Sequence, residues 1–330
     1  MQKNENIIRF YLDQNVIDYL IKGNLNFIKK IINQVPNSEI VYSYVTLREF
    51  SRIDHDIQRK SYLDFLKNSN AKYFWIDNDG YAYFEEVDPN EKYNELESEN
   101  PVYKNLEDSM LGMMHKLFGG KKNVDFNEIA ESQKVSFNEL IEFINKSLDS
   151  LEDNILIDKE QFKNQTQSMN KYFIELIDKS INQIKVHSSE NTLNELRKLL
   201  DINIVELNNI VPPNIIIQTW ERIKDGIKRN NINLTFNDLF GDGILKYYSN
   251  QKITMTMKVN GLHNLLNSLG YYSDKGIQND NKFFPFINDQ KHVGNAIYSN
   301  YFVTRDKRLM KKTEAVYEHL KIGTQIIFIQ

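Results

Sequence analysis

Four acidic residues stand where the sequence passes from one expected element to the next, and they suggest a shared chemistry. In chain order they are Asp13, Glu49, Asp289 and Asp306. Carboxylates that converge repel one another, so a cluster of them needs a bound cation or raised pKa values. Hard oxygen ligands select Mg²⁺ or Mn²⁺. Such ions activate water and stabilise the transition state of phosphoryl transfer.

Each acid also has an ordinary structural explanation. Aspartate is common at helix N-caps, which could account for Asp13 and Asp289. Glu49 lies three residues after Thr46, the spacing of a capping box. Asp306 is of a type common in turns. A shared site is favoured because all four fit one alternating pattern of strands and helices. In parallel α/β sheets, ligands bind at the carboxyl ends of the strands, where Asp13 and Asp306 are expected and to which Glu49 is close.

Short apolar runs rich in β-forming residues predict the strands that would position these acids. The runs are 7–12, 39–45, 71–76, 301–304 and 325–329. Helical spacing follows several of them, with helices expected over 15–34, from Thr46, over 253–269, from Asp289, and over 307–320. This alternation predicts a parallel sheet with right-handed crossovers. Residues 85–100 are acidic and polar and are expected to form a loop.

The middle of the chain has a different character. Strand signals are nearly absent from 105 to 249, whereas apolar residues recur at helical spacing, for example after Ser136 and Thr192. This stretch is too long for a loop. The sequence therefore predicts a discontinuous sheet domain made of 1–90 and 250–330, with a mostly helical insertion over 91–249.

Composition excludes several classes of protein. The 330 residues include no cysteine, which rules out disulfides, thiolate zinc sites and cysteine nucleophiles. A net charge of −4 excludes a strongly basic polymer binder but allows a local basic patch. No apolar run reaches a membrane-spanning length of about 18 residues, and the N-terminus lacks signal-peptide features. We expect a cytoplasmic protein without a membrane partner.

The motifs around the acids resemble those of PIN-like domains, a family of metal-dependent nucleases. The matching segments are Leu12-Asp13-Gln14-Asn15-Val16, then Val45-Thr46-Leu47-Arg48-Glu49-Phe50, then Asp289-x-x-His292-x-x-x-Ala296, and last Val303-Thr304-Arg305-Asp306-Lys307. Each motif is short, and their order among strands is the more specific feature. The resemblance covers roughly residues 1–90 and 250–330.

The resemblance implies an α/β three-layer sandwich with a parallel sheet of about five strands. Asp13, Glu49, Asp289 and Asp306 would be catalytic metal ligands for Mg²⁺ or Mn²⁺, and Asn15 and Thr304 would support the site. The implied activity is phosphodiester hydrolysis that leaves a 5′-phosphate, as in an endoribonuclease, with RNA favoured over DNA. A toxin-like or antiviral defence role follows from the habits of the family.

Other side chains close to these motifs are candidates for binding substrate. Arg305 and Lys307 begin a basic segment that could hold phosphates, although a solvated helix face is an equally ordinary explanation. Arg48 and His292 lie beside proposed ligands. His292 could contact a phosphate or transfer a proton, or it could pack between a helix and the sheet.

One large departure from the family leaves alternatives open. Glu49 and Asp289 are 240 positions apart (289 minus 49), and the helical insertion fills that interval. The insertion could bind substrate, a protein partner or an inhibitor, and a homo-oligomer is possible. The chain could instead be an inactive PIN-like scaffold or a structure-specific DNA nuclease. An aspartyl phosphatase is set aside because Asn15 stands where that class needs a second aspartate.

Overall fold

The computed structural model describes residues 7–23, 34–151, 158–187, 192–242 and 252–330. Its strands are β1 Ile8–Leu12, β2 Ser38–Ser43, β3 Lys72–Ile76, β4 Ala82–Glu85, β5 Tyr301–Thr304 and β6 Gln325–Phe328. They form one sheet in the order β4-β3-β2-β1-β5-β6. All neighbours pair in parallel except β4, which runs antiparallel to β3. The protein is therefore an α/β protein with a mostly parallel, mixed sheet.

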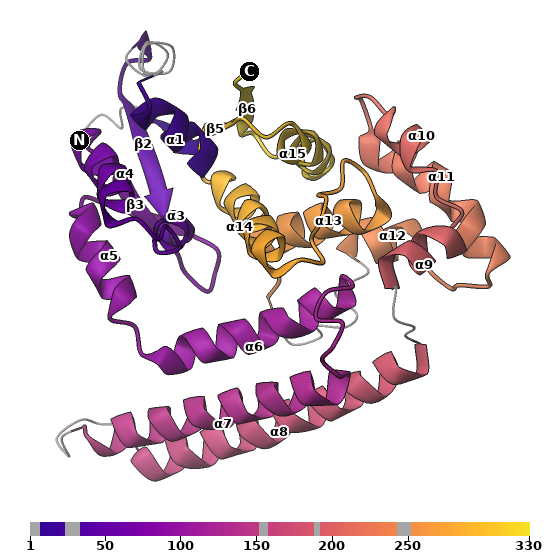
Figure 1. The fold of residues 1–330 in the computed structure, drawn as a ribbon, viewed down its shortest axis with the longest axis horizontal. Coiled ribbons are helices and arrows are strands. Elements are labelled where there is room, and N and C mark those ends of the chain that lie inside the picture. The colour runs from indigo at the N-terminus through magenta and orange to yellow at the C-terminus, as the bar shows by residue number, and fades with distance from the viewer. Residues whose placement is uncertain (1–6, 24–33, 152–157, 188–191, 243–251) are drawn as a thin grey trace. The chain divides into compact units, whose positions relative to one another are not determined.

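Strands from the two ends of the chain meet in the centre of this sheet (Figure 1). Leu12 of β1 pairs with Val303 of β5. The five expected strands are all present, with small shifts at their ends. The sixth, β4, lies in a segment for which the sequence analysis predicted no strand, and α5 (Pro89–Glu97) occupies part of the expected loop over 85–100.

Helices cover both faces of the sheet. Successive residues of a strand point to opposite faces, so neighbouring residues of β1 pack against different helices. Phe10 and Leu12 pack into a core shared with α1 (Gln14–Ile21), α3 (Tyr44–Phe50) and α4 (Asp56–Asn68). Tyr11, between them, faces a second core shared with α11 (Ile215–Arg229), α13 (Met255–Leu269), α14 (Asp280–Ala296) and α15 (Lys307–Leu320). The predicted helix over 15–34 is present as α1 up to Ile21, and its residues 24–33 lie outside the described part of the chain.

The middle of the chain, from α5 to α13, is largely helical, as the sequence predicted. Its other helices are α6 Pro101–Leu117, α7 Phe126–Asp149, α8 Lys159–His187, α9 Thr192–Leu199, α10 Ile204–Asn208 and α12 Phe236–Phe240. The helical spacing after Ser136 belongs to a longer helix, since Ser136 lies inside α7.

Contacts divide the chain into two compact units whose limits differ from the predicted domain boundaries. One consists of Met1–Glu97, Leu196–Lys275 and Phe284–Gln330, and the other of Ser98–Glu195 and Gly276–Phe283. The sheet unit thus includes much of the middle region, since Ile223, Ile227 and Leu266 belong to its core. Among its described residues, the second unit has the helices α6, α7 and α8 and no strand.

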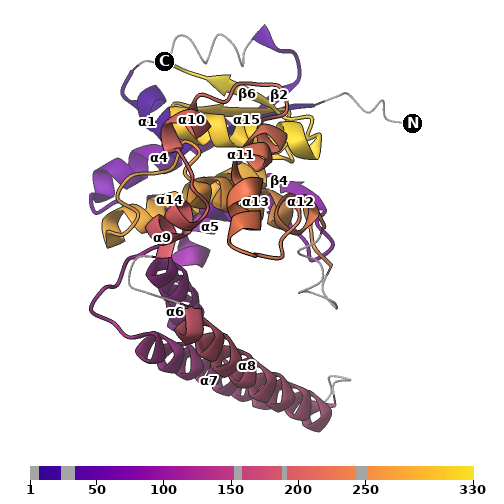
Figure 2. The ribbon, with the colours of Figure 1, turned by 90° about the vertical axis from the view of Figure 1, so that its right-hand side faces the viewer.

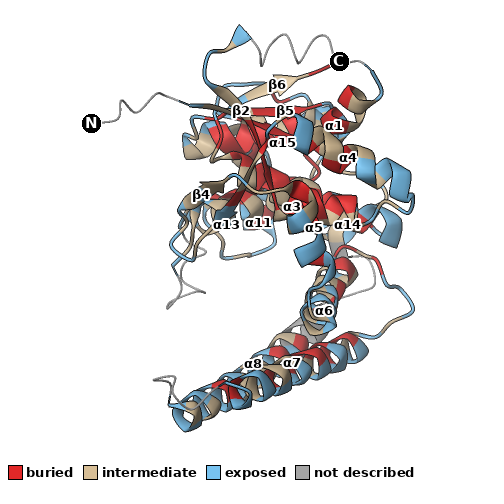
Figure 3. Cartoon of the chain, turned by 90° about the vertical axis from the view of Figure 1, so that its left-hand side faces the viewer, coloured by how far each residue is buried: buried red, intermediate tan, exposed pale blue. Residues whose placement is uncertain are grey.

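The helical unit is built on neighbouring helices with a small apolar core. α7 packs against both α6 and α8, and α7 and α8 run side by side in Figure 2. Phe137 of α7 stacks on Phe173 of α8 with ring centroids 4.0 Å apart. Figure 3 shows the exposed faces of these helices in pale blue. Across the described residues, no helix combines the length and apolarity that crossing a membrane requires.

Candidate active site

Asp13 lies at the carboxyl end of β1, in the centre of the sheet. Its backbone N–H donates to Val303 O at 3.0 Å, so the residue continues the pairing of β1 with β5. The residue is only 1% exposed. Although Asp13 holds the N-cap position of α1, its side chain makes no capping hydrogen bond. Helix capping, the usual reason for an aspartate at such a position, therefore does not explain Asp13.

The Asp13 carboxylate receives its hydrogen bonds from two residues that the sequence had placed in the site. Thr304 Oγ1 donates to Asp13 Oδ2 at 2.8 Å, and Asn15 Nδ2 donates to the same oxygen at 3.4 Å. Burial raises the pKa of Asp13, and the nearby Glu49 carboxylate adds to that rise, whereas His292 and the two hydrogen bonds act against it. The net pKa is raised because burial is the largest of these effects.

Glu49 lies in the last turn of α3, and the expected capping box with Thr46 is not formed. α3 begins at Tyr44 with Ser43 as N-cap, and the Ser43 N–H donates to Thr46 Oγ1 at 3.4 Å. Sequence reasoning placed the helix start three residues late. The Glu49 side chain, 8% exposed, pairs instead with His292: Oε2 lies 2.7 Å from Nε2.

His292 is fully buried and joins several elements through a chain of hydrogen bonds. Its Nδ1 lies 2.6 Å from the Tyr11 hydroxyl, which lies 3.0 Å from Ser43 Oγ. Asn295 Nδ2 also donates to Ser43 Oγ, at 3.0 Å. Burial opposes a charged imidazole, but Tyr11, Glu49 and Asp13 together outweigh it and raise the pKa of His292 well above its usual range. His292 is therefore held as a partner of Glu49. Tyr11, Ser43 and Asn295 complete this arrangement, and their sequence positions gave no signal of it.

Asp289 does not begin a helix, contrary to the sequence prediction. It lies inside α14, which begins at Asp280 and contains Pro285. The polar residues 280–282 at its start and the internal Pro285 concealed the first turns of this helix. The pKa of Asp289 is raised well above its usual range, and burial is the largest cause. The carboxylates of Asp13, Glu49, Asp274 and Asp306 raise it further, in that order of size. The four predicted acids therefore act on one another electrostatically.

Asp306 follows β5 and caps the next helix. Its Oδ1 accepts from the backbone N–H groups of Arg308 at 2.6 Å and Leu309 at 2.9 Å. The Asp306 N–H donates to Thr304 Oγ1 at 3.0 Å. Thr304 thus contacts both Asp13 and Asp306, so one hydroxyl aligns the ends of β1 and β5.

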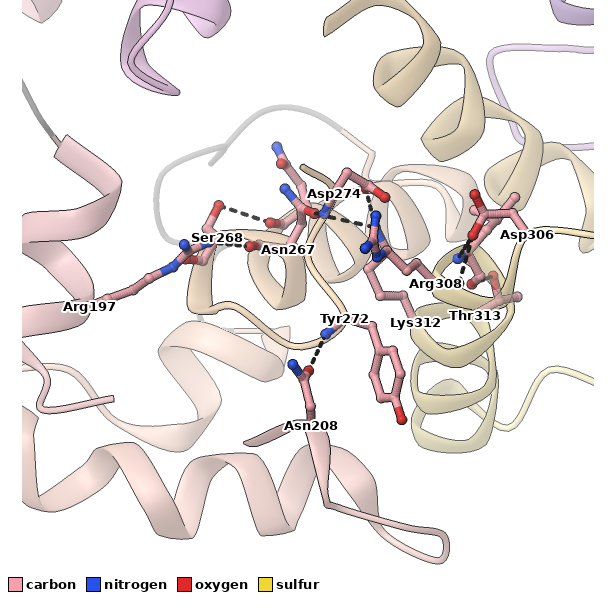
Figure 4. A network of polar contacts seen from close by, with 12 residues as sticks. Arg197, Asn208, Asn267, Ser268, Tyr272, Asp274, Asp306, Arg308, Lys312 and Thr313 are labelled. Atoms are coloured by element: carbon pink, nitrogen blue, oxygen red, sulfur yellow. Dashed lines mark hydrogen bonds and ion pairs between the residues drawn. The ribbon is translucent and has the colours of Figure 1, made fainter. Parts of the chain in front are cut away.

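A fifth carboxylate, Asp274, belongs to the same electrostatic environment and was missed by sequence reasoning. Lys312 of α15 forms an ion pair with Asp274 Oδ2 and donates to Asn267 Oδ1 at 3.3 Å (Figure 4). The Asp274 N–H donates to the same Asn267 oxygen at 2.8 Å. Lys312 is 1% exposed, so it does not belong to a solvated face of α15. Asp274 stands alone in a polar loop, and no local pattern marks it.

The network in Figure 4 continues to the end of α13. Arg197 Nε and Nη2 donate to the carbonyl oxygens of Ser268 at 2.8 Å and Asn267 at 2.9 Å, both in the last turn of α13. Burial lowers the pKa of Arg197. The arginine fixes the helix end from which Asn267 reaches Asp274 and Lys312.

The remaining candidates lie around this centre with different degrees of exposure. Arg305 is exposed and its guanidinium lies 4.0 Å from the centre of the Tyr19 ring. Lys307 is the exposed first residue of α15, and Arg48 is partly buried on α3 beside Glu49. Their part in binding substrate stays a prediction.

The donor chemistry of the site fits Mg²⁺ or Mn²⁺. All four predicted ligands are carboxylates, the donor type that these ions prefer. Burial is the main cause of the raised pKa values of Asp13 and Asp289, and neighbouring carboxylates add to both. The side chains are not gathered for coordination: among the described residues, no three His, Asp or Glu side chains lie close enough to hold an ion. Binding an ion would require the carboxylates to draw closer.

Comparison with known proteins adds no assignment: no family model, curated protein or solved structure matches the chain.

Proposed function

We propose that this chain is a Mg²⁺- or Mn²⁺-dependent nuclease of the PIN-like kind, with RNA as the favoured substrate. The observation that carries the proposal is that Asp13 and Asp306 follow neighbouring parallel strands and are linked by Thr304, whose hydroxyl donates to Asp13 and accepts from the Asp306 N–H. These acids come from both ends of the chain, and the pairing of β1 with β5 brings those ends together. Buried acids whose pKa values are raised, as for Asp13 and Asp289, are more frequent at functional sites than elsewhere.

The architecture supports the same family. The resemblance implies a three-layer sandwich with about five parallel strands, and the parallel strands β3, β2, β1, β5 and β6 stand in this order with cores on both faces. Asp13 and Asp306 follow the neighbouring strands β1 and β5. This is the end of a parallel sheet at which ligands bind. The antiparallel β4 is an addition at the rim.

The residues of the chain would divide the work of the site. Asp13, Glu49, Asp289 and Asp306 would hold the ion, which when bound supplies charge for a phosphoryl transition state and a more acidic water. Thr304 and Asn15 orient the Asp13 carboxylate, and His292 orients that of Glu49. Arg305 and Lys307 would attract the phosphates of the substrate.

Cleavage assays test this proposal directly. Purified protein is incubated with single-stranded and duplex RNA and DNA, each with Mg²⁺, Mn²⁺ or a chelator, beside an Asp13→Asn variant. We expect ion-dependent cleavage of RNA that the variant lacks. Cleavage that persists unchanged in the variant would exclude the proposed site, and cleavage of DNA alone would favour a structure-specific DNA nuclease.

An inactive scaffold is a second candidate, favoured by one specific observation. Glu49 is already paired with His292, and Asp306 already caps α15. In a scaffold these contacts would be the whole role of the two acids, and the helical unit would bind a protein or nucleic acid. A scaffold predicts no cleavage of any substrate in the same assay and no saturable Mn²⁺ binding at the four acids.

A further inference from the structure

β4 forms one edge of the sheet and offers its outer side for pairing. It pairs with β3 alone, with Tyr83 opposite Trp75 and Glu85 opposite Tyr73. No other strand in the described ranges lies beyond it. The backbone groups on the outer side of an edge strand are a template for another extended segment. Figure 3 shows β4 at the rim of the sheet unit.

A pair of aromatic side chains lies next to this edge and remains partly exposed. Trp75 and Tyr83 stack across the two strands, with ring centroids 4.5 Å apart and planes 18° from parallel. They are 41% and 45% exposed, and Tyr81, just before β4, is 66% exposed. Stacking on each other leaves area on both rings that a partner could cover. Trp and Tyr are also the residue types most enriched in binding hot spots.

The charges around the aromatic pair select a cationic partner. Glu85 Oε1 accepts from Trp75 Nε1 at 2.7 Å, and Asp77 Oδ2 accepts from the Tyr83 hydroxyl at 3.0 Å. Hydrogen bonds, chiefly from the Tyr81 backbone N–H, lower the pKa of Asp77. Aromatic faces beside carboxylates attract Lys and Arg side chains, whereas nucleic-acid phosphates would be repelled.

Nearby lysines do not reverse this preference. Lys72 pairs with Glu86 at 2.6 Å, and Lys252 pairs with Asp79 at 2.7 Å. Each of these two cations is thus matched by an acid of its own. Asp77 and Glu85 remain as the carboxylates that contact the aromatic pair.

The hairpin that carries these residues is held in place. The Asp77 N–H donates to Tyr81 O at 3.0 Å, which closes the turn between β3 and β4. The Tyr298 hydroxyl, from the sheet unit, donates to Gly80 O at 2.9 Å. A surface fixed in this way loses little conformational entropy when a partner binds.

We propose that β4 is a docking edge for an extended, basic segment of a partner protein. The segment adds to the sheet as a further strand through backbone hydrogen bonds. Its alternate side chains point to one face, where Lys or Arg residues lie over Trp75 and Tyr83 between the Asp77 and Glu85 carboxylates. This surface does not depend on the nuclease activity proposed above.

Tryptophan fluorescence tests the proposal, because the chain has two tryptophans, Trp75 and Trp220. A Trp220→Phe variant leaves Trp75 as the reporter, and circular dichroism checks that it folds. A ten-residue peptide of alternating Thr and Arg is titrated into it, beside a Thr and Glu peptide of the same length. We expect a saturable change with the Arg peptide alone. No saturable change with the Arg peptide would overturn the proposal.

Two further comparisons separate strand addition from simple charge attraction. Adding Tyr83→Ala should weaken binding of the Arg peptide about fivefold or more, whereas adding Tyr103→Ala, which removes a 48% exposed tyrosine of α6, should not. Methylating alternate backbone nitrogens of the peptide should abolish binding. Equal affinities in the two variants, or binding that survives methylation, would contradict the proposal. The proposal would also be contradicted if a uridine decanucleotide, and not the Arg peptide, gave a saturable change in Trp75 fluorescence.

Discussion

The imidazole Nε2 of His292 lies 2.7 Å from Glu49 Oε2, which joins two buried side chains 243 positions apart in the chain. The other ring nitrogen lies 2.6 Å from the Tyr11 hydroxyl. The ring is therefore fixed between α3 and β1 while it belongs to α14. This contact joins the N-terminal and C-terminal segments that contribute to the proposed site, and it gives Glu49 a defined orientation without any ion.

Removing His292 should strongly destabilise the protein. His292→Ala would leave Glu49 buried and unpaired, which costs about 3–5 kcal/mol when one partner of a buried ion pair is lost. Urea unfolding with the metal-free protein measures this loss. His292→Gln keeps a side-chain donor and should lose less. Equal stabilities of His292→Ala and the wild type would contradict the described pairing.

The hydroxyl of Thr304 should stabilise the fold through Asp13. Thr304→Val removes the 2.8 Å hydrogen bond to a buried carboxylate, and hydrogen bonds to charged groups contribute about 1.5–3 kcal/mol. Thr304→Ser retains the hydroxyl and is the matched control. Chemical denaturation should place Thr304→Ser close to the wild type and Thr304→Val well below it. The reverse order would refute this role.

The stability of the metal-free protein should fall as the pH rises, in part because of Asp289. Its folded pKa is raised well above the usual value, so the folded state keeps a proton that the unfolded state releases above about pH 4. The stabilisation is complete below that pH and is lost as the pH rises through the folded pKa. Thermal melts of Asp289→Asn should show a smaller loss of stability as the pH rises above about 4. Parallel profiles for the two proteins would count against a raised pKa.

Lys312 should contribute to stability through Asp274 although it lies in a segment that looks like a basic surface. Lys312→Met would leave Asp274, whose side chain is 18% exposed, without its cation. Because Asp274 keeps some contact with water, we expect a cost near the lower end of the range for a broken buried pair, about 3 kcal/mol. The double variant with Asp274→Asn should recover part of that loss. If the stability losses of the two single variants simply add up in the double variant, Lys312 and Asp274 do not interact.

Much of the sheet could be predicted because each strand is a short apolar run, a local signal. Helix 307–320 was predicted with the bounds that α15 has, since Asp306 caps it and its apolar residues recur at helical spacing. β4 was missed because a polar turn precedes it and acidic residues follow it.

The candidate site was predictable only in part, because its contacts join distant residues. The identities of Asp13 and Thr304 could be inferred from short motifs, but their hydrogen bond depends on the pairing of β1 with β5. Lys312 looked like a solvated residue, since nothing local reveals a partner 38 positions earlier. The role of His292 likewise depends on Tyr11 and Glu49, which lie in the other half of the chain.

Calorimetric titration of Mn²⁺ into the metal-free protein tests most directly whether the four acids form a metal site. The wild type and Asp13→Asn are compared at neutral pH, with thermal melts to show that both are folded. We predict saturable binding to the wild type and an affinity at least about tenfold weaker for Asp13→Asn, since the variant lacks a ligand charge. Equal affinities, or no binding to the folded wild type, would contradict it.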